Sequence, residues 1–228
     1  MIRFENLTKS FWVRGTRKLV IDNLNMTLPT GKSLGLLGLN GAGKSTLMQI
    51  IAGTMHSDSG RVVTDGSISW PVGFAGSFHP DLTGAQNVRF LARVYGVDTE
   101  ALVDFVQGFS DIGPHFDAPV RTYSSGMRAR LAFGASMGVH FDTYLIDEVT
   151  AVGDAAFRKK SKELFLARMT KSSAILVSHE MGQMRNFCNA GIVLHQGQLS
   201  YFDDINEAIE VHLENIARSQ ERVTPVRA

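Results

Sequence analysis

Residues 38–45 read GLNGAGKS and combine residue types that suit the binding of a phosphorylated ligand. Glycines let the backbone curl closely around an anion with its N–H groups turned inward. Lys44 adds a positive charge for the terminal phosphates, and the hydroxyl of Ser45 can ligate Mg²⁺. An ordinary turn with an incidental lysine is the alternative, but an apolar strand precedes this segment and a helix follows it. The residues expected to bind a nucleotide here are Gly38, Asn40, Gly41, Ala42, Gly43, Lys44, Ser45 and Thr46.

Two acids follow the apolar run 143–146 and could supply the rest of such a site. The carboxyl ends of parallel strands converge on the ligand crevice of an α/β sheet. We therefore expect Asp147 to bind Mg²⁺, directly or through water, and Glu148 to polarise the attacking water as a general base. Taken alone, the pair could equally be two solvated carboxylates at a strand end. The phosphate loop favours the catalytic interpretation.

His179 ends another apolar run, 174–178. A neutral imidazole at that point can donate a hydrogen bond to a γ-phosphate, which makes His179 a candidate catalytic residue. A single histidine is weak support, and by itself a surface histidine at a helix start is the simpler interpretation.

The elements that must position these residues alternate between strands and helices, which predicts an α/β fold with a mostly parallel sheet. Residues 1–30 alternate apolar and polar and are expected to form antiparallel strands. A hairpin is expected over 61–70, turning at Asp65 and Gly66. The further strands are expected at 33–37, 143–146, 174–177, 191–195 and 198–202. The helices are expected at 46–53, 84–95, 100–109, 125–139, 155–169 and 204–217.

Composition excludes several classes of protein. The 228 residues are 44% apolar and 20% charged, as in a soluble globular domain, and we expect one domain over 1–228. The net charge of +1 gives no support to nucleic-acid binding. Cys188 is the one cysteine, so no disulfide framework exists and a small core residue is expected. Without a signal peptide or a long apolar run, we expect a cytoplasmic protein.

The segment 123–131, YSSGMRARL, resembles the signature sequence of ABC ATPases. An N-capped helix start, with Ser124 or Ser125 as the cap, is a compatible interpretation. The order of motifs along the chain also resembles this family, from an aromatic residue near the start to His179. The resemblance implies an ABC cassette of the phosphate-loop NTPase class that uses ATP and Mg²⁺. It implies an N-terminal antiparallel β subdomain, a helical subdomain at roughly 84–138 and a closing helix at 204–217.

The same resemblance implies a site shared between two copies of the chain. In this family two cassettes pair head to tail, so Ser124 and Gly126 would touch the γ-phosphate held by the partner copy. Asp154, which ends the turn 151–154, joins the expected nucleotide contacts. Phe11 stands where the family places the ring that stacks on adenine. Trp12 is the alternative, and an aromatic residue here could also belong to the core.

Two segments, 147–157 and 76–84, are similar to the polysaccharide-export branch of the family. The chain ends soon after the cassette, so we expect no added carbohydrate-binding domain and a capsular polysaccharide export ATPase. The branch implies a homodimer on the cytoplasmic face of the bacterial inner membrane, bound to two copies of an ABC-2 type permease. Periplasmic and outer-membrane export components would be indirect partners. The alternatives are an O-antigen or teichoic acid exporter, a non-transport ABC ATPase acting on ribosomes or DNA, and a small-molecule kinase.

One feature departs from the family pattern. Most members carry a glutamine in the loop after the expected hairpin, but none occurs between Trp70 and Phe78, and Gln86 falls inside an expected helix. We expect the loop 73–78 and the following helix to form the permease groove. Phe74 and Phe78 would be its apolar anchors, or else core residues.

Overall fold

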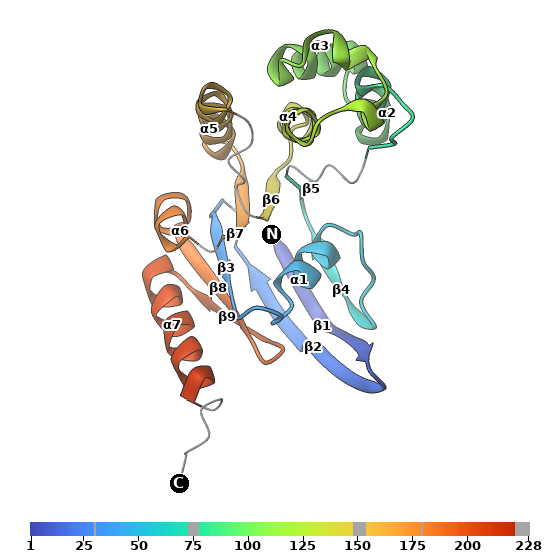
Figure 1. Cartoon of the computed structure of the whole chain (residues 1–228). Helices are drawn as coiled ribbons and strands as arrows, with labels where there is room; N and C mark the ends of the chain where they lie inside the picture. Colours follow the sequence, from blue (N-terminus) through green and yellow to red (C-terminus); the bar gives the residue numbers. More distant parts are fainter. Residues whose placement is uncertain (30, 73–77, 148–153, 179, 222–228) are drawn as a thin grey trace. The chain divides into compact units, whose positions relative to one another are not determined.

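The computed structural model describes residues 1–29, 31–72, 78–147, 154–178 and 180–221 (Figure 1). The chain divides into two compact units. The phosphate-loop unit comprises Met1–Ile68, Thr143–Glu148 and Ser173–Ala228. The helical unit comprises Ser69–Asp142 and Val149–Ser172.

An antiparallel sheet of order β2-β1-β4 opens the phosphate-loop unit. Its strands are β1 (Ile2–Val13), β2 (Thr16–Leu28) and β4 (Ser59–Thr64). Arg14 and Gly15 both have positive φ angles, 49° and 78°, which suits the tight turn between β1 and β2. The register places Val13 opposite Thr16 and Phe11 opposite Lys18. The expected antiparallel start of the chain is confirmed.

The second sheet of this unit has the order β6-β7-β3-β8-β9, with all pairs parallel except β8 with β9. The buried positions of β3, β7 and β8 are almost continuous, as expected for strands covered on both faces. These strands are β6 (Thr143–Asp147), β7 (Ser173–Val177), β3 (Leu34–Leu37), β8 (Ala190–His195) and β9 (Gln198–Phe202). The mostly parallel α/β sheet predicted from sequence is confirmed.

Three helices accompany these strands: α1 (Lys44–Ile51), α6 (Met181–Phe187) and α7 (Ile205–Glu221). In Figure 1, α7 runs alongside β8 and β9. A Cβ atom on Gly191 of β8 would lie 2.3 Å from the Cβ of Ala208 on α7. Glycine at this strand position therefore allows the helix to pack closely on the sheet.

The helical unit contains α2 (Gly84–Tyr95), α3 (Thr99–Ser110), α4 (Ser125–Gly138) and α5 (Ala155–Met169). Two short 3-10 turns, Gly113–Asp117 and Val120–Thr122, connect α3 to α4. The ring of Phe109 on α3 packs 5.8 Å from Phe133 on α4 and 5.3 Å from Phe157 on α5, measured between centroids. One aromatic residue thus joins three helices into a common core.

The hairpin expected over 61–70 is wrong. β4 pairs with β1, with Val62 opposite Phe4, whereas β5 (Ile68–Pro71) belongs to a different sheet from β4. Val62 packs against the buried core around Phe4, so the long-range pairing buries apolar surface that a local hairpin would leave exposed. Asp65 and Gly66 do lie between two strands, as predicted, but these strands do not pair with each other as a hairpin.

Helix positions agree with expectation apart from their ends. α1 begins at Lys44 rather than Thr46, and Gly53, with φ of 72°, follows its end as predicted. α6 was not predicted, because its seven residues include a glycine and no side chain caps its start. Within the described residues, no helix is both long enough and apolar enough to cross a bilayer.

Candidate nucleotide-binding site

The phosphate loop connects the central strand β3 to α1. Gly43 occupies the N-cap position of α1 with φ of 110°, in the left-handed region. A Cβ atom there would also lie 2.2 Å from Cγ1 of Val20 on β2. Both the backbone angle and the crowding require glycine. The turn brings the first N–H groups of α1 to the end of the loop, where they can meet an anion.

Lys44 is half-buried and lies along the loop. Its Nζ donates hydrogen bonds to the carbonyl oxygens of Gly38, at 2.7 Å, and Leu39, at 3.3 Å. Burial lowers the pKa of Lys44 from its ordinary value, and the negative charge of Asp147 partly opposes that shift. Lys44 is thus held at the loop by two hydrogen bonds, and its ammonium interacts electrostatically with the carboxylate of Asp147 on β6.

A cavity of about 520 Å³ opens over this loop, a size that suits a nucleotide. The predicted residues that line it are Asn40, Gly41, Gly43, Lys44, Ser45, Thr46, Phe11 and Asp147. Gly38 and Ala42 belong to the loop but do not line the cavity. Val13, Lys18, Val20 and Val177 complete the lining and were not predicted.

The β1–β2 hairpin presents one face to the cavity. Alternate residues of a strand share a face, and Phe11, Val13, Lys18 and Val20 all line the cavity. Trp12 pairs with Arg17 on the other face and is 75% exposed. Of the two candidate rings, Phe11 is therefore the one beside the loop. The two-residue turn and the alternation of the strands are the signals that could have identified Lys18 and Val20 from sequence.

A small polar network supports Phe11 from β1. Lys9 Nζ lies 5.3 Å from the centroid of the Phe11 ring and 3.0 Å from Oδ1 of Asp58. Asp58 also accepts hydrogen bonds from the hydroxyl and the backbone N–H of Ser10, at 2.6 and 2.7 Å. These contacts lower the pKa of Asp58 to about 2. The hydrogen bond from the Ser10 hydroxyl is the largest cause, and the hydrogen bond from Lys9 is the second. The strand that carries Phe11 is thereby tied to the segment before β4.

Ser45 and Asp147 offer oxygen donors that fit Mg²⁺. Asp147 ends β6, beside Val177 of β7, and lines the same cavity as Ser45. A hydroxyl and a carboxylate are hard oxygen ligands, and Mg²⁺ usually takes one or two such groups from the protein and the rest from phosphates and water. Glu148 and His179 lie outside the described residues.

The signature segment begins α4 in the helical unit. The hydroxyl oxygen of Ser124 accepts a hydrogen bond from the N–H of Met127 at 3.1 Å, so Ser124, rather than Ser125, is the N-cap. Ser124, Ser125 and Gly126 are exposed. A Cβ on Gly126 would meet nothing closer than the Ser124 hydroxyl, 3.8 Å away, so the start of this helix is uncrowded.

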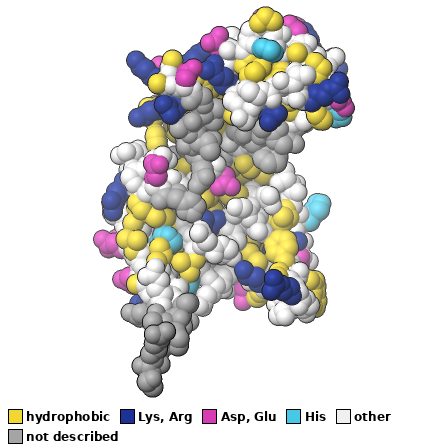
Figure 2. All heavy atoms as spheres, viewed as in Figure 1, with side chains coloured by type: hydrophobic (Ala, Val, Ile, Leu, Met, Phe, Trp, Pro, Cys, Tyr) yellow, Lys and Arg dark blue, Asp and Glu magenta, His cyan; other side chains and the backbone are white. Residues whose placement is uncertain are grey.

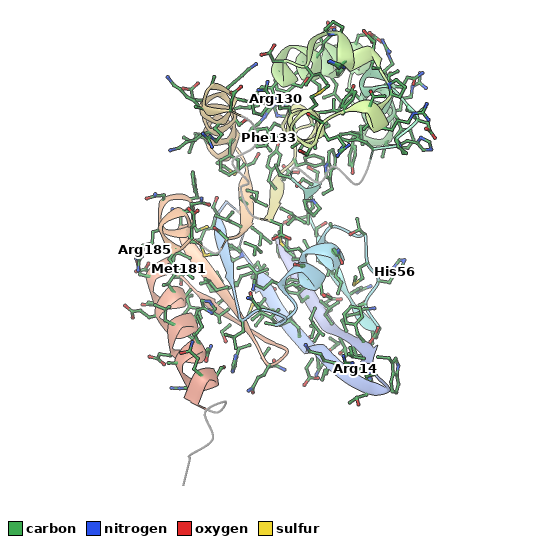
Figure 3. All side chains as sticks on the ribbon, in the orientation of Figure 1. Arg14, His56, Arg130, Phe133, Met181 and Arg185 are labelled. Atoms are coloured by element: carbon green, nitrogen blue, oxygen red, sulfur yellow. The ribbon has the colours of Figure 1, made fainter. Side chains whose placement is uncertain are left out.

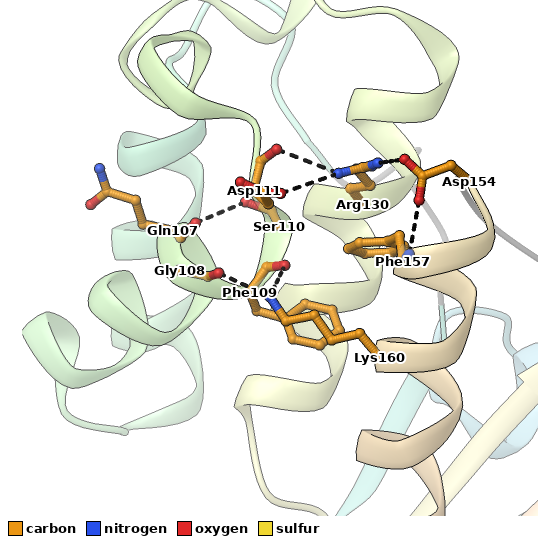
Figure 4. Close-up of polar contacts among 9 residues, drawn as sticks. All are labelled: Gln107, Gly108, Phe109, Ser110, Asp111, Arg130, Asp154, Phe157 and Lys160. Carbon is orange, nitrogen blue, oxygen red and sulfur yellow. Dashed lines mark hydrogen bonds and ion pairs between the residues drawn. The ribbon is translucent and has the colours of Figure 1, made fainter.

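Asp154 has structural partners within the helical unit (Figure 4). One carboxylate oxygen accepts from the N–H of Phe157 at 2.9 Å and caps α5, and the other pairs with Arg130 of α4 at 2.9 Å. The N–H of Phe157 and the charge of Arg130 lower the pKa of Asp154, with the N–H the larger cause. Asp154 thus links α5 to the signature helix, a function that the sequence did not reveal.

Two residues of the expected permease groove have roles inside the fold. Phe78 is 9% exposed, which confirms the core alternative for that ring. Gln86 accepts a hydrogen bond from the N–H of Thr83 at 2.9 Å, as half of a capping box at the start of α2. Phe74, with the rest of 73–77, lies outside the described residues.

The sequence of the chain matches a known protein family. Residues 21–151 match the family model described as "ABC transporter". The chain belongs to the ABC transporter family. The cassette is 50% identical over 212 residues to the polysialic acid transport ATP-binding protein KpsT of Escherichia coli, covering 92% of this chain and 97% of that protein. It is 43% identical over 213 residues to the capsule polysaccharide export ATP-binding protein CtrD of Neisseria meningitidis, covering 93% and 98%.

A solved structure shares the fold of the cassette. The ATP-binding cassette MJ0796, described as a dimer in a post-hydrolysis state bound to ADP and Pi, superposes with a TM-score of 0.72. The match covers 90% of this chain and 99% of that chain, at 20% sequence identity. At this level of identity, the likeness establishes the ABC cassette fold.

Proposed function

We propose that this chain is the ATP-hydrolysing subunit of an exporter of capsular polysaccharide. The ATPase part rests on one observation above all, the convergence of Lys44, Ser45 and Asp147 on a nucleotide-sized cavity beside the Phe11 ring. The polysaccharide part rests on similarity to KpsT and CtrD over more than nine-tenths of each chain.

Each side chain has a distinct role in the proposed reaction. Phe11 stacks on adenine, and the loop N–H groups and Lys44 hold the β- and γ-phosphates. Ser45 and Asp147 would hold Mg²⁺, which would supply positive charge to the phosphate oxygens. Glu148 takes a proton from the attacking water, and His179 donates a hydrogen bond to the γ-phosphate.

A second copy of the chain completes each site. Ser124 and Gly126, at the uncrowded start of α4, contact the γ-phosphate bound by the partner, and Asp154 positions that helix through Arg130. ATP therefore favours the closed pair, and hydrolysis with product release favours the open one. The pair acts on two copies of an ABC-2 type permease at the cytoplasmic face of the inner membrane. Periplasmic and outer-membrane capsule components contact it only indirectly.

Deletion of the gene in its host tests the proposal. Capsular polymer should accumulate inside the cells and disappear from their surface. The wild-type gene should restore the surface capsule, whereas a gene carrying Lys44→Ala should not. O-antigen, measured in the same cells, is the internal control and should stay normal. Normal surface capsule together with loss of O-antigen or teichoic acid would assign the cassette to one of the related exporters instead.

A further inference from the structure

Lys18 reaches from the β1–β2 hairpin to the phosphate loop. It lies on β2 directly opposite Phe11 and lines the cavity above the loop. Its Nζ donates to the carbonyl oxygen of Gly41 at 3.3 Å. Hairpin and loop belong to the same compact unit, so this bridge is a contact within one body. The ammonium of Lys18 is thus positioned between the aromatic side of the cavity and its phosphate side.

The other cations of the hairpin are engaged elsewhere or point away. Figure 2 shows Lys and Arg side chains gathered beside hydrophobic ones over this hairpin. Lys9 pairs with Asp58 at 3.0 Å, and Nε of Arg17 donates to the Ser10 hydroxyl at 2.9 Å. Arg14 lies at the turn and does not line the cavity (Figure 3). Within the described ranges, no carboxylate pairs with Lys18, so its charge is available to a ligand.

The charge of the expected ligand calls for such a group. ATP bound with Mg²⁺ keeps a net negative charge that Lys44 alone does not neutralise. A lysine ammonium has three donors, so Lys18 can keep its bond to Gly41 and still donate to a phosphate oxygen. Because Lys18 approaches the loop from the side of Phe11, the phosphates nearest to it are those next to the nucleoside.

We propose that Lys18 is a second nucleotide-binding cation of this cassette, contacting the α- or β-phosphate. This inference rests on the proposed function of the cavity as an ATP site. The hairpin would then contact both adenine and phosphate, through two side chains that lie side by side on one face of β1 and β2. Since ATP and ADP share these two phosphates, Lys18 contributes equally to the binding of both.

Binding of ATP and ADP to the full chain, measured by calorimetry in the presence of Mg²⁺, tests this assignment. Lys18→Gln should raise the Kd for both ATP and ADP by about five- to tenfold, which is the effect expected for the loss of an exposed charge-assisted hydrogen bond. Lys18→Arg should stay within about twofold of wild type. Arg14→Gln is the matched control, since it removes the same charge from the same hairpin outside the cavity, and should change nothing. The effect of Lys18→Gln should shrink as salt rises, because the contact is solvent-accessible.

The outcomes separate this inference from the proposed function. If Lys18→Gln matches Arg14→Gln while Lys44→Ala loses binding, Lys18 has no role and the ATP site stands. Weakened ATP with unchanged ADP would place Lys18 at the γ-phosphate and overturn the assignment. If wild type binds neither nucleotide, the proposed function and this inference both fail. Thermal unfolding of each variant shows whether a loss of binding reflects a loss of fold.

Discussion

The hydroxyl of Tyr123 lies 2.5 Å from the point where a Cβ atom would stand on Gly84. Gly84 begins α2, and Tyr123 immediately precedes Ser124, the N-cap of α4. The segments before the two helices are also joined by backbone hydrogen bonds of 2.9 Å, from Val120 to Leu82 and from Arg121 to Pro80. The start of α2 and the start of the signature helix are therefore fixed to each other.

This contact predicts that Gly84→Ala destabilises the fold. Tyr123 is 3% exposed and cannot move into solvent without losing its packing, so the added methyl should cost about 1–3 kcal/mol. In a Tyr123→Phe background the cost should be smaller, although the carbonyl of Phe116, 3.0 Å from the same point, prevents full relief. Urea denaturation of the wild type, the two single variants and the double variant measures this coupling. An equal cost in both backgrounds would show that the hydroxyl is not the obstacle.

The face of the hairpin predicts unequal roles for its two aromatic residues. Phe11→Ala should raise the KM for ATP by roughly five- to a hundredfold, as expected for the loss of one ring stacked on a base. Trp12→Ala should leave the KM near wild type, because Trp12 points away from the cavity. Steady-state hydrolysis at varied ATP concentration distinguishes the two, and the reverse order of effects would assign adenine to Trp12.

The Asp58 network predicts a pH-dependent contribution to stability. The pKa of Asp58 is lowered from 3.8 to about 2, so its stabilising effect is present above pH 3.8 and is lost as pH falls towards 2. Asp58→Asn should reduce the free energy of unfolding at pH 7 by about 1 kcal/mol, a figure reduced for solvent screening. The difference from wild type should narrow below pH 4.

Urea denaturation between pH 7 and pH 3 measures this effect. Asp104→Asn is a suitable control, since Asp104 is an exposed carboxylate on α3 and the structure shows it in no ion pair with another described residue. A constant difference between wild type and Asp58→Asn over the whole pH range would contradict the proposed ionic network.

Replacement of Glu148 tests the assignment of the general base. Glu148→Gln should bind ATP normally and hydrolyse it slower by orders of magnitude, because the amide cannot accept the proton from water. In the presence of ATP and Mg²⁺, size-exclusion chromatography should show a stable pair of chains. Hydrolysis at the wild-type rate would mean that another residue is the base.

The placement of the proposed nucleotide site was largely predictable because it depends on local sequence. Gly43, Lys44 and Ser45 are consecutive, and one strand-to-helix turn positions all three. Asp147 could be added because the ends of parallel strands meet at one edge of a sheet. The short helix α6 and the destination of β4 could not be predicted, since neither a cap nor a local partner announces them.

The sequence by itself determined the local features of this protein: a phosphate loop, a carboxylate at the end of a parallel strand and a helix capped by a serine. Only the tertiary structure decided which neighbouring side chains share that chemistry. The register of β1 on β2 turns Phe11 and Lys18 towards the loop and Trp12 away from it. Packing of α5 against α4 brings the carboxylate of Asp154 within hydrogen-bond distance of the Arg130 guanidinium. Such pairings are contacts between residues distant in sequence, and strand register and burial decide which residues meet. A local motif does not predict them, because it specifies only the residues next to it in the chain.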